Sequence, residues 1–570
     1  RDHLVGLVGS EMCIRDRYNL AIAYQLRIRG EGADNLEQAI NHYEQAQEVY
    51  TREAYPEQWA ACQHNLANAY HFRIRGERAD NLEQAIHHHE QALEVRTHED
   101  YPERWAISQY NLAFAYYDRI RGERADNLER AIQHCEQAQE VYSREAYPGQ
   151  WAACQHNLAV DYQERIRGVR ADNLEKAIHH YDQALEIDTL LRSPASFRKT
   201  KHQLGNLYFG ATRWAEALKA LKEAIGADQV LLASAYTETG RQTEVAQTAR
   251  IYVDAAYALL KLDRAGEALA QLEQGKTRLL TQALALNEVD LSLLPAAQQD
   301  SLHPLRETLR ALDAEMRLPA DTPARRNERA LADLLSQTRT DLNEAIEAVR
   351  ATHPEFMPEG LRLSEILALI PSGGVLVAPV VTLHGSAIFV VPAGTQSVTL
   401  DHVLWVEAFK HADLQRLLRG PAEAPQWGGW LGAYFNARTE GHAWFDAIET
   451  TGQVLWDRML APLVGRLTAL HAKHVLLMPQ GGLGLLPLHA AWREVDGKRR
   501  YFLDDFPVTY VPSAYALSVS QERLRDEHRH EHTLFAMVNP TEDLAFAPAE
   551  GEQVSRLFGE HNSHVPVSYT

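Results

Sequence analysis

The sequence predicts a multidomain protein: an all-α repeat solenoid, then a helical connector, then an α/β domain. Three observations carry this prediction. A block of 46 residues recurs at fixed spacing, which is the signature of stacked structural units. From about residue 291 the composition changes to charged helical segments punctuated by proline. After Pro371, short runs rich in β-branched residues alternate with helical segments.

Length, charge and cysteine content bound the function. A chain of 570 residues is too long for one core. Its formal net charge of -20 argues against direct nucleic-acid binding, which needs a basic face. The net charge does not exclude a local basic patch in a folded groove. No apolar run approaches the roughly eighteen residues that span a bilayer. The four cysteines lack CxxC spacing, which favours a reducing, cytoplasmic setting: Cys13, Cys62, Cys135 and Cys154.

Residues 1–17 fit no repeat. The stretch from Val8 to Arg17 looks like a translated sequencing adapter, and it lacks the cleavage pattern of a signal peptide. We therefore predict that 1–17 is a non-native segment and leave Cys13 out of the fold reasoning.

Each repeat within residues 18–290 predicts two antiparallel helices. In the clearest copy, Pro56 stands near the start of the first helix, where its missing N–H costs little. Asp80 and Glu83 predict an acidic, capping-box-like start to the second helix. The apolar face of that helix comprises Leu82, Ala85, Ile86, His89 and Ala92.

These packing positions resemble the tetratricopeptide family. The resemblance rests on Leu66-Ala67 and Tyr70 in the first helix and on Ala85, His89 and Ala92 in the second. It covers four long copies, a fifth, more ordinary copy at 204–218 and a degenerate pair at 257–276. It implies a solenoid whose concave face binds a protein or an extended peptide.

An asparagine recurs every 46 residues on the first helix of each pair, at Asn19, Asn65, Asn111 and Asn157. A row of amides at this spacing can clamp the backbone of a peptide, and we predict these residues as the peptide-binding site. The alternative is that each asparagine bonds a neighbouring helix and sets the superhelical pitch. The sequence favours neither.

We predict neither a metal site nor a cofactor. His87, His88 and His89 form a cluster, but His89 occupies a position that is filled by Tyr43, Cys135 and Tyr181 in other copies, which predicts a core residue. The triplet Gly275-Lys276-Thr277 lies in a helical context, and Ala270 stands where a phosphate loop needs its first glycine.

We assign residues 291–355 to the helical connector and 356–570 to the α/β domain. Val375–Val381 and Ser386–Val391 predict a β-hairpin, and Trp444–Leu470 a helix. The apolar run from Val475 predicts a strand in a sheet covered on both faces. The alternation continues with predicted strands at 508–511 and 534–538 and helices at 514–525 and 549–558.

Three ordered motifs in this domain resemble the opening half of a CHAT domain, a relative of caspases and separases. They are Leu477-Met-Pro-Gln-Gly-Gly-Leu-Gly-Leu-Leu-Pro-Leu-His-Ala, Val511-Pro-Ser-Ala-Tyr-Ala-Leu and Val538-Asn-Pro. The helix around Leu272-Glu-Gln-Gly-Lys-Thr-Arg is also similar to the one that leads into CHAT domains behind tetratricopeptide repeats.

This resemblance implies a cysteine endopeptidase with a Cys-His dyad. In the family, the histidine follows a strand downstream of the Asn-Pro motif, and the cysteine ends the next strand. No cysteine follows Cys154, so we expect both catalytic residues beyond Thr570 and a C-terminally truncated, incomplete caspase-like domain. The chain as printed is then inactive. Family membership further implies a role in bacterial signalling or defence.

Other candidates within the α/β domain favour structural roles. His489 belongs to a packing motif, and Ser513 lacks a G-x-S-x-G elbow. Gly481, Gly482 and Gly484 do not form a dinucleotide fingerprint. His528, His530 and His532 lie in a charged loop without HExxH spacing. Two functions remain: the front part of a repeat-gated peptidase, or a non-catalytic protein-binding scaffold.

Overall fold

The computed structural model describes residues 15–25, 27, 31–234, 238–287, 294–316, 326–352, 361–421, 428–436, 441–525, 534–535 and 563–564. Most of the segment predicted as non-native lies outside these ranges. So do the predicted helix 549–558, the end of the strand predicted at 534–538, and His528, His530 and His532.

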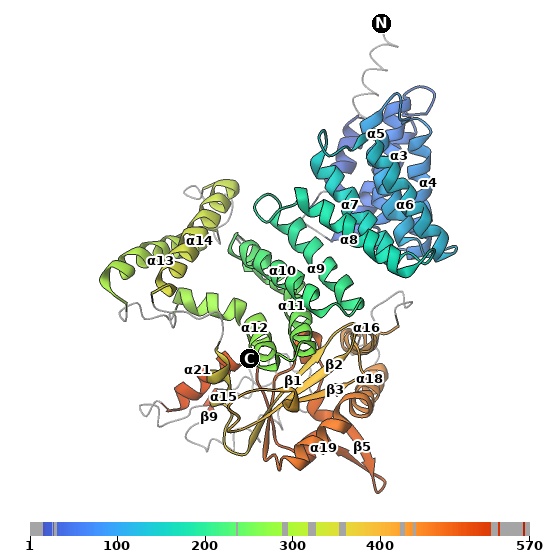
Figure 1. The fold of residues 1–570 in the computed structure, drawn as a ribbon. Coiled ribbons are helices and arrows are strands. Elements are labelled where there is room, and N and C mark those ends of the chain that lie inside the picture. The colour runs from blue at the N-terminus through green and yellow to red at the C-terminus, as the bar shows by residue number, and fades with distance from the viewer. Residues whose placement is uncertain are drawn as a thin grey trace.

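The first half of the chain is a solenoid of paired antiparallel helices (Figure 1). It begins with helical residues 15–25. The following helices are α2 (Gly32–Gln47), α3 (Pro56–His71), α4 (Arg78–Leu93), α5 (Pro102–Asp118), α6 (Arg124–Val141), α7 (Pro148–Glu164), α8 (Arg170–Ile187), α9 (Pro194–Gly210), α10 (Trp214–Ser234), α11 (Glu238–Lys261) and α12 (Ala265–Asn287).

Small residues let the paired helices pack closely. Ala60, Ala67 and Ala69 on α3, with Ala85 and Ala92 on α4, are fully buried. The prolines that begin α3, α5, α7 and α9 stand in the first helical turn, where the lost N–H has no intrahelical partner. The loops between paired helices turn at glycines of positive φ, Gly76, Gly122 and Gly168. These features explain why the landmarks recur.

The first helices of the pairs line the inner side of the stack. Helix α3 contacts α5, α5 contacts α7, and α7 contacts α9. The second helices instead pack on the first helix of the following repeat, as in the pairs α4–α5, α6–α7 and α8–α9. The crowded side of a curved stack is its concave side, so α3, α5, α7 and α9 carry the concave face.

A helical hairpin follows the solenoid. It consists of α13 (Ala296–Met316) and α14 (Glu328–Arg350), which share a leucine-rich core. Helix α14 contacts α10. These helices match the predicted helical connector in type.

The second half of the chain is an α/β region. Its strands are β1 (Gly374–Val381), β2 (Ser386–Pro392), β3 (Val403–Val406), β4 (His474–Leu477), β5 (Trp492–Val495), β6 (Lys498–Tyr501), β7 (Val508–Tyr510), β8 (Leu534–Phe535) and β9 (Ser563–His564). Its helices include α15 (Leu363–Ala368), α16 (His411–Arg419), α17 (Gly429–Phe435), α18 (Gly441–Leu455), α19 (Ala461–Ala469), α20 (Phe502–Asp505) and α21 (Ala514–Arg525).

Five strands form the central sheet in the order β3-β2-β1-β4-β7. The predicted hairpin is present, because β1 and β2 pair antiparallel with Val377 opposite Val390. Strand β4 runs parallel to both β1 and β7. The predicted helix 444–470 is α18 and α19 joined by a π-helical turn, Trp456–Leu460. The hairpin of β5 and β6 was not predicted.

Each face of the sheet has its own helical cover, since neighbouring residues of a strand point to opposite faces. Val375 and Val377 join the core formed with α16, α18 and α19. Leu376 and Val380 join the core that contains α11 and α12. The last solenoid helices therefore form a layer of the α/β region, and α12 lies between the repeats and the sheet in Figure 1. The predicted fold class, a solenoid followed by a two-face-covered α/β region, is confirmed.

Candidate functional site

The asparagine ladder lies on the concave helices and bonds across the repeats. Asn65 donates to the Tyr18 hydroxyl at 2.9 Å, and Asn111 donates to Asn68 Oδ1 at 3.1 Å. Asn157 hydrogen bonds Tyr110. Asn19 is exposed on the first helical segment, whereas the other three are half-buried. The contacts of the pitch-setting alternative are thus present, and the amides also reach the concave surface. Peptide binding by these residues stays a prediction.

Buried imidazoles form a second line of contacts between the first helices. His64 Nδ1 lies 3.2 Å from Ser108 Oγ, and His156 Nδ1 lies 2.9 Å from Thr200 Oγ1. Burial lowers the pKa of both His64 and His156 to about 3. These side chains are therefore neutral at physiological pH and connect successive repeats as uncharged partners.

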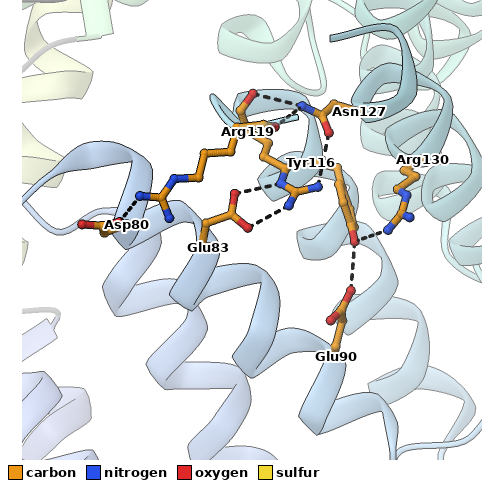
Figure 2. Close-up of polar contacts among 8 residues, drawn as sticks. Asp80, Glu83, Glu90, Tyr116, Arg119, Asn127 and Arg130 are labelled. Atoms are coloured by element: carbon orange, nitrogen blue, oxygen red, sulfur yellow. Dashed lines mark hydrogen bonds and ion pairs between the residues drawn. The ribbon is translucent and has the colours of Figure 1, made fainter. Parts of the chain in front are cut away.

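An arginine fork joins the second helix α4 to the next repeat (Figure 2). Arg119 Nε and Nη2 donate to the two carboxylate oxygens of Glu83 at 2.8 Å each. Arg121 pairs with Asp80 beside it. The same bidentate geometry recurs 46 residues away on either side, between Arg73 and Glu37 and between Arg165 and Glu129. Planar guanidinium matches a carboxylate in this geometry, which fixes orientation as well as distance.

These contacts correct the capping expectation for Asp80 and Glu83. Neither caps α4, whose N-cap is Glu77 with no side-chain cap hydrogen bond. Both carboxylates instead turn outward to arginines of the next repeat. The loop is closed by Asn81, which donates to the Arg75 carbonyl at 2.9 Å. The acidic residues at this helix start therefore couple repeats.

A tyrosine beside the fork extends the polar seam. The Tyr116 hydroxyl donates to Glu90 at 2.9 Å and accepts from Arg130 at 2.8 Å (Figure 2). The Arg119 guanidinium lies over the same ring at 5.7 Å from its centroid. The seam thus combines ion pairing and hydrogen bonding with cation–π contact at one aromatic ring.

Of the three clustered histidines, His89 is a core residue, as predicted, whereas His87 is exposed and His88 is half-buried. His89 is almost fully buried and packs edge-on against His64, with 5.3 Å between ring centroids. The equivalent Tyr43, Cys135 and Tyr181 are also fully buried. Within the described ranges, no group of three His, Cys, Asp or Glu side chains is arranged to hold a metal ion.

The described cysteines are unsuited to nucleophilic chemistry. Cys62, Cys135 and Cys154 are all fully buried in the solenoid. Burial raises the pKa of the Cys62 and Cys154 thiols to about 12 and that of Cys135 in the same direction. A reactive cysteine needs an accessible thiolate, so these three residues pack rather than react.

Candidates in the α/β region take structural positions. His489 Nδ1 lies 3.0 Å from the Tyr510 hydroxyl, which links the loop after β4 to β7. Ser513 is buried and its Oγ accepts from Ala516 N at 3.1 Å, so it caps α21. Lys276 and Thr277 lie inside α12, which excludes a strand-to-helix phosphate loop.

The junction of solenoid and sheet is packed with aromatic side chains. Tyr257 of α11 packs against Phe209 of α9 and against Trp405 of β3, with 5.6 and 5.7 Å between ring centroids. Its hydroxyl lies against Gly385 in the β1–β2 turn, where a Cβ would approach to 2.4 Å. Lys261 Nζ lies 3.8 Å from the centroid of a Trp405 ring. The repeats and the sheet therefore share one packed core.

Comparison with known protein families finds a match in the C-terminal part of the chain. Residues 449–569 match the family model of the CHAT domain. The chain has a TPR-CHAT architecture. The match begins within α18, but β1 to β3 pair in the same sheet as β4, so the structural unit extends upstream of it. The boundary predicted at residue 356 stays a prediction.

Solved structures similar to this TPR-CHAT chain are repeat proteins. The apo form of RapI is 15% identical, with 59% of this chain and 99% of that chain covered and a TM-score of 0.34. BtubC from P. vanneervenii is 19% identical, with 45% and 93% covered and a TM-score of 0.33. The Rap protein complexed with Competence and Sporulation Factor is 18% identical, with 59% and 97% covered and a TM-score of 0.26. At TM-scores this low we base no conclusion on them.

Two further searches, for curated relatives and for membrane-spanning helices in the described part of the chain, found nothing. No curated protein matches the chain. Among the helices that the structure describes, none is long and apolar enough to cross a membrane.

Proposed function

We propose that this chain is the front part of a TPR-CHAT cysteine endopeptidase of the cytoplasm, in which the repeats bind a protein or peptide and thereby gate proteolysis. The proposed chemistry is that of a Cys-His pair, which the resemblance to CHAT domains implies. The observation that carries the proposal is the shared core, because helices α11 and α12 end the solenoid and cover one face of the CHAT sheet. A change of curvature in the repeats then reaches the sheet through packed side chains.

The proposed ligand is an extended peptide on the concave face. Asn65, Asn111 and Asn157 are half-buried there at a spacing of one repeat, and each amide keeps hydrogen-bonding capacity beyond its contact with the preceding repeat. Peptide-backbone groups are suitable partners for such amides. The acidic chain, with its net charge of -20, disfavours nucleic acid as the direct ligand.

A non-catalytic scaffold is the second candidate. The observation that favours it is the state of the described cysteines, which are buried, have raised pKa values and lie outside the α/β region. On this alternative the repeats bind a partner protein, and the CHAT region serves as a platform.

A pair of variants separates binding from packing at the ladder. Asn111→Ala removes the bond to Asn68 Oδ1 and a 3.4 Å contact with His64 Nε2. Ser108→Ala removes the contact with His64 Nδ1. Each variant weakens the packing of α3 on α5 and lowers stability by about 1 kcal/mol. Ser108 is buried and Asn111 reaches the concave face, so only Asn111→Ala weakens binding to a peptide array in fluorescence titration. Equal peptide affinities for the two variants would leave Asn111 with a packing role alone.

The peptidase assignment is tested on the product of the complete gene. Peptide binding to the repeats should increase cleavage of a protein substrate, and alkylation of an accessible thiol should abolish that cleavage. Peptide binding without any thiol-dependent cleavage would establish the scaffold instead.

A further inference from the structure

A buried carboxylate of the solenoid caps a helix of the CHAT region. Glu273 of α12 is fully buried. Its two oxygens accept hydrogen bonds from the backbone N–H groups of Ala514 and Tyr515, at 2.8 Å each. These are the first two residues of α21, whose N–H groups have no partner within the helix. The carboxylate also lies at the positive end of the α21 dipole.

A lysine one turn later completes the contact. Lys276 Nζ donates to the Pro512 carbonyl at 2.7 Å, in the loop that precedes α21. Ser513 in the same loop satisfies the third N–H of the helix, that of Ala516. Burial raises the pKa of Glu273 and lowers that of Lys276 to about 8, while their proximity opposes both shifts. The first turn of α21 is therefore held by its own serine and by two side chains of another domain.

The loop that Lys276 contacts lies at the carboxyl-terminal edge of the parallel strands, where ligand-binding sites form in open α/β sheets. Residues 511–513 follow β7, which runs parallel to β4. Val511 N donates to the Leu477 carbonyl at 2.9 Å, so the loop begins beside the carboxyl end of β4. In open α/β sheets, ligands bind outside the carboxyl ends of parallel strands. The contact from α12 thus reaches the functional edge of the fold.

We propose that Glu273 and Lys276 are positioning residues through which the solenoid sets the geometry of the CHAT site. Any shift of α12 within the repeats moves the cap and displaces residues 511–515 at the sheet edge. This inference rests on the proposed function, in which the repeats gate the CHAT region. It specifies the route, from α12 through two side chains to the loop after β7.

Gly275 lies between Glu273 and Lys276, and substituting it offers a way to move α12. A Cβ at Gly275 would approach the Cβ of Tyr252 on α11 to 2.8 Å, so Gly275→Ala forces α12 away from α11. Glu273→Gln keeps the side-chain length but turns one acceptor into an N–H donor that faces a backbone N–H. The matched control is Glu267→Gln, on the same helix, where the exposed carboxylate pairs only locally with Arg264.

Hydrogen exchange of the 570-residue chain, followed by mass spectrometry, tests the proposal. Glu273→Gln should raise exchange at residues 514–516 by about tenfold or more, whereas Glu267→Gln leaves it unchanged. Gly275→Ala should also raise exchange at 514–516, but add little in the Glu273→Gln background, because the route is already broken. Full additivity of the two variants, or no effect of Gly275→Ala at 514–516, would overturn the proposal.

A second variant covers the case in which Glu273→Gln unfolds the junction. Lys276→Met removes the bond to Pro512 and the positive charge near Glu273, and it keeps most of the aliphatic stem. It should raise exchange at 514–516 and suppress the effect of Gly275→Ala in the same way. Unchanged coupling in Lys276→Met would overturn the role of the lysine. None of these measurements uses a peptide ligand or peptidase activity, so failure of the proposed function would not mimic failure of this inference.

Discussion

The fork between Arg119 and Glu83 should contribute measurably to the coupling between repeats. The two side chains are each 25% exposed and make two parallel bonds of 2.8 Å. Hydrogen bonds to charged groups contribute about 1.5–3 kcal/mol, and partial exposure reduces this, so we expect a coupling energy of about 1–2 kcal/mol. Arg119→Lys should lose most of it, because an ammonium cannot bond both oxygens in plane.

The neighbouring pair provides the control. Arg121 and Asp80 span the same two repeats, but their side chains are 56% and 58% exposed. Exposed pairs contribute about 0–1 kcal/mol. A double-mutant cycle with Arg119→Met and Glu83→Gln, measured by urea unfolding, should therefore give a larger coupling energy than one with Arg121→Met and Asp80→Asn. Equal coupling energies for the two pairs would refute the reasoning.

Three further outcomes follow from burial and backbone geometry. The folded-state pKa of His156 lies below its usual 6.5, so its contribution to stability is present above that pH and is lost toward pH 3, by up to about 1.4 kcal/mol per unit. His156→Tyr, which copies Tyr110 of the preceding repeat, should reduce the fall of the urea midpoint between pH 7.5 and 4.5 and leave the part that His64 contributes. Gly122→Ala should cost about 1–2 kcal/mol in thermal unfolding because φ is +79°, whereas Gly149→Ala, in open space, should not destabilise. Cys154 should react with a thiol reagent only at the rate of unfolding.

The sequence predicted the repeat architecture because its landmarks act locally. Gly76, Gly122 and Gly168 recur since each loop needs positive φ, and prolines recur since each first helix starts there. The role of Glu83 was missed because its partner, Arg119, lies 36 residues away. A capping box is a local rule, and it cannot weigh a competing partner in the next repeat.

The junction between the solenoid and the sheet was the part of the structure that the sequence predicted least well. The segment around Leu272 was singled out by resemblance, but the partners of Glu273 lie 241 and 242 residues later. Nothing in periodicity or composition connects α12 to α21. The short hairpin of β5 and β6 was also missed, because its exposed, charged strand Lys498–Tyr501 lacks the apolar alternation that marks a half-buried strand.

The central claim is that α11 and α12 make the repeats and the CHAT sheet one coupled unit, and hydrogen exchange of Tyr257→Ala tests it most directly. Loss of this buried ring should cost about 3–5 kcal/mol and raise exchange in both α9 and β3, on the two sides of the junction. The control, Tyr116→Ala, should affect the repeats and leave β3 unchanged. An increase for Tyr257→Ala that stays on one side of the junction would contradict the account.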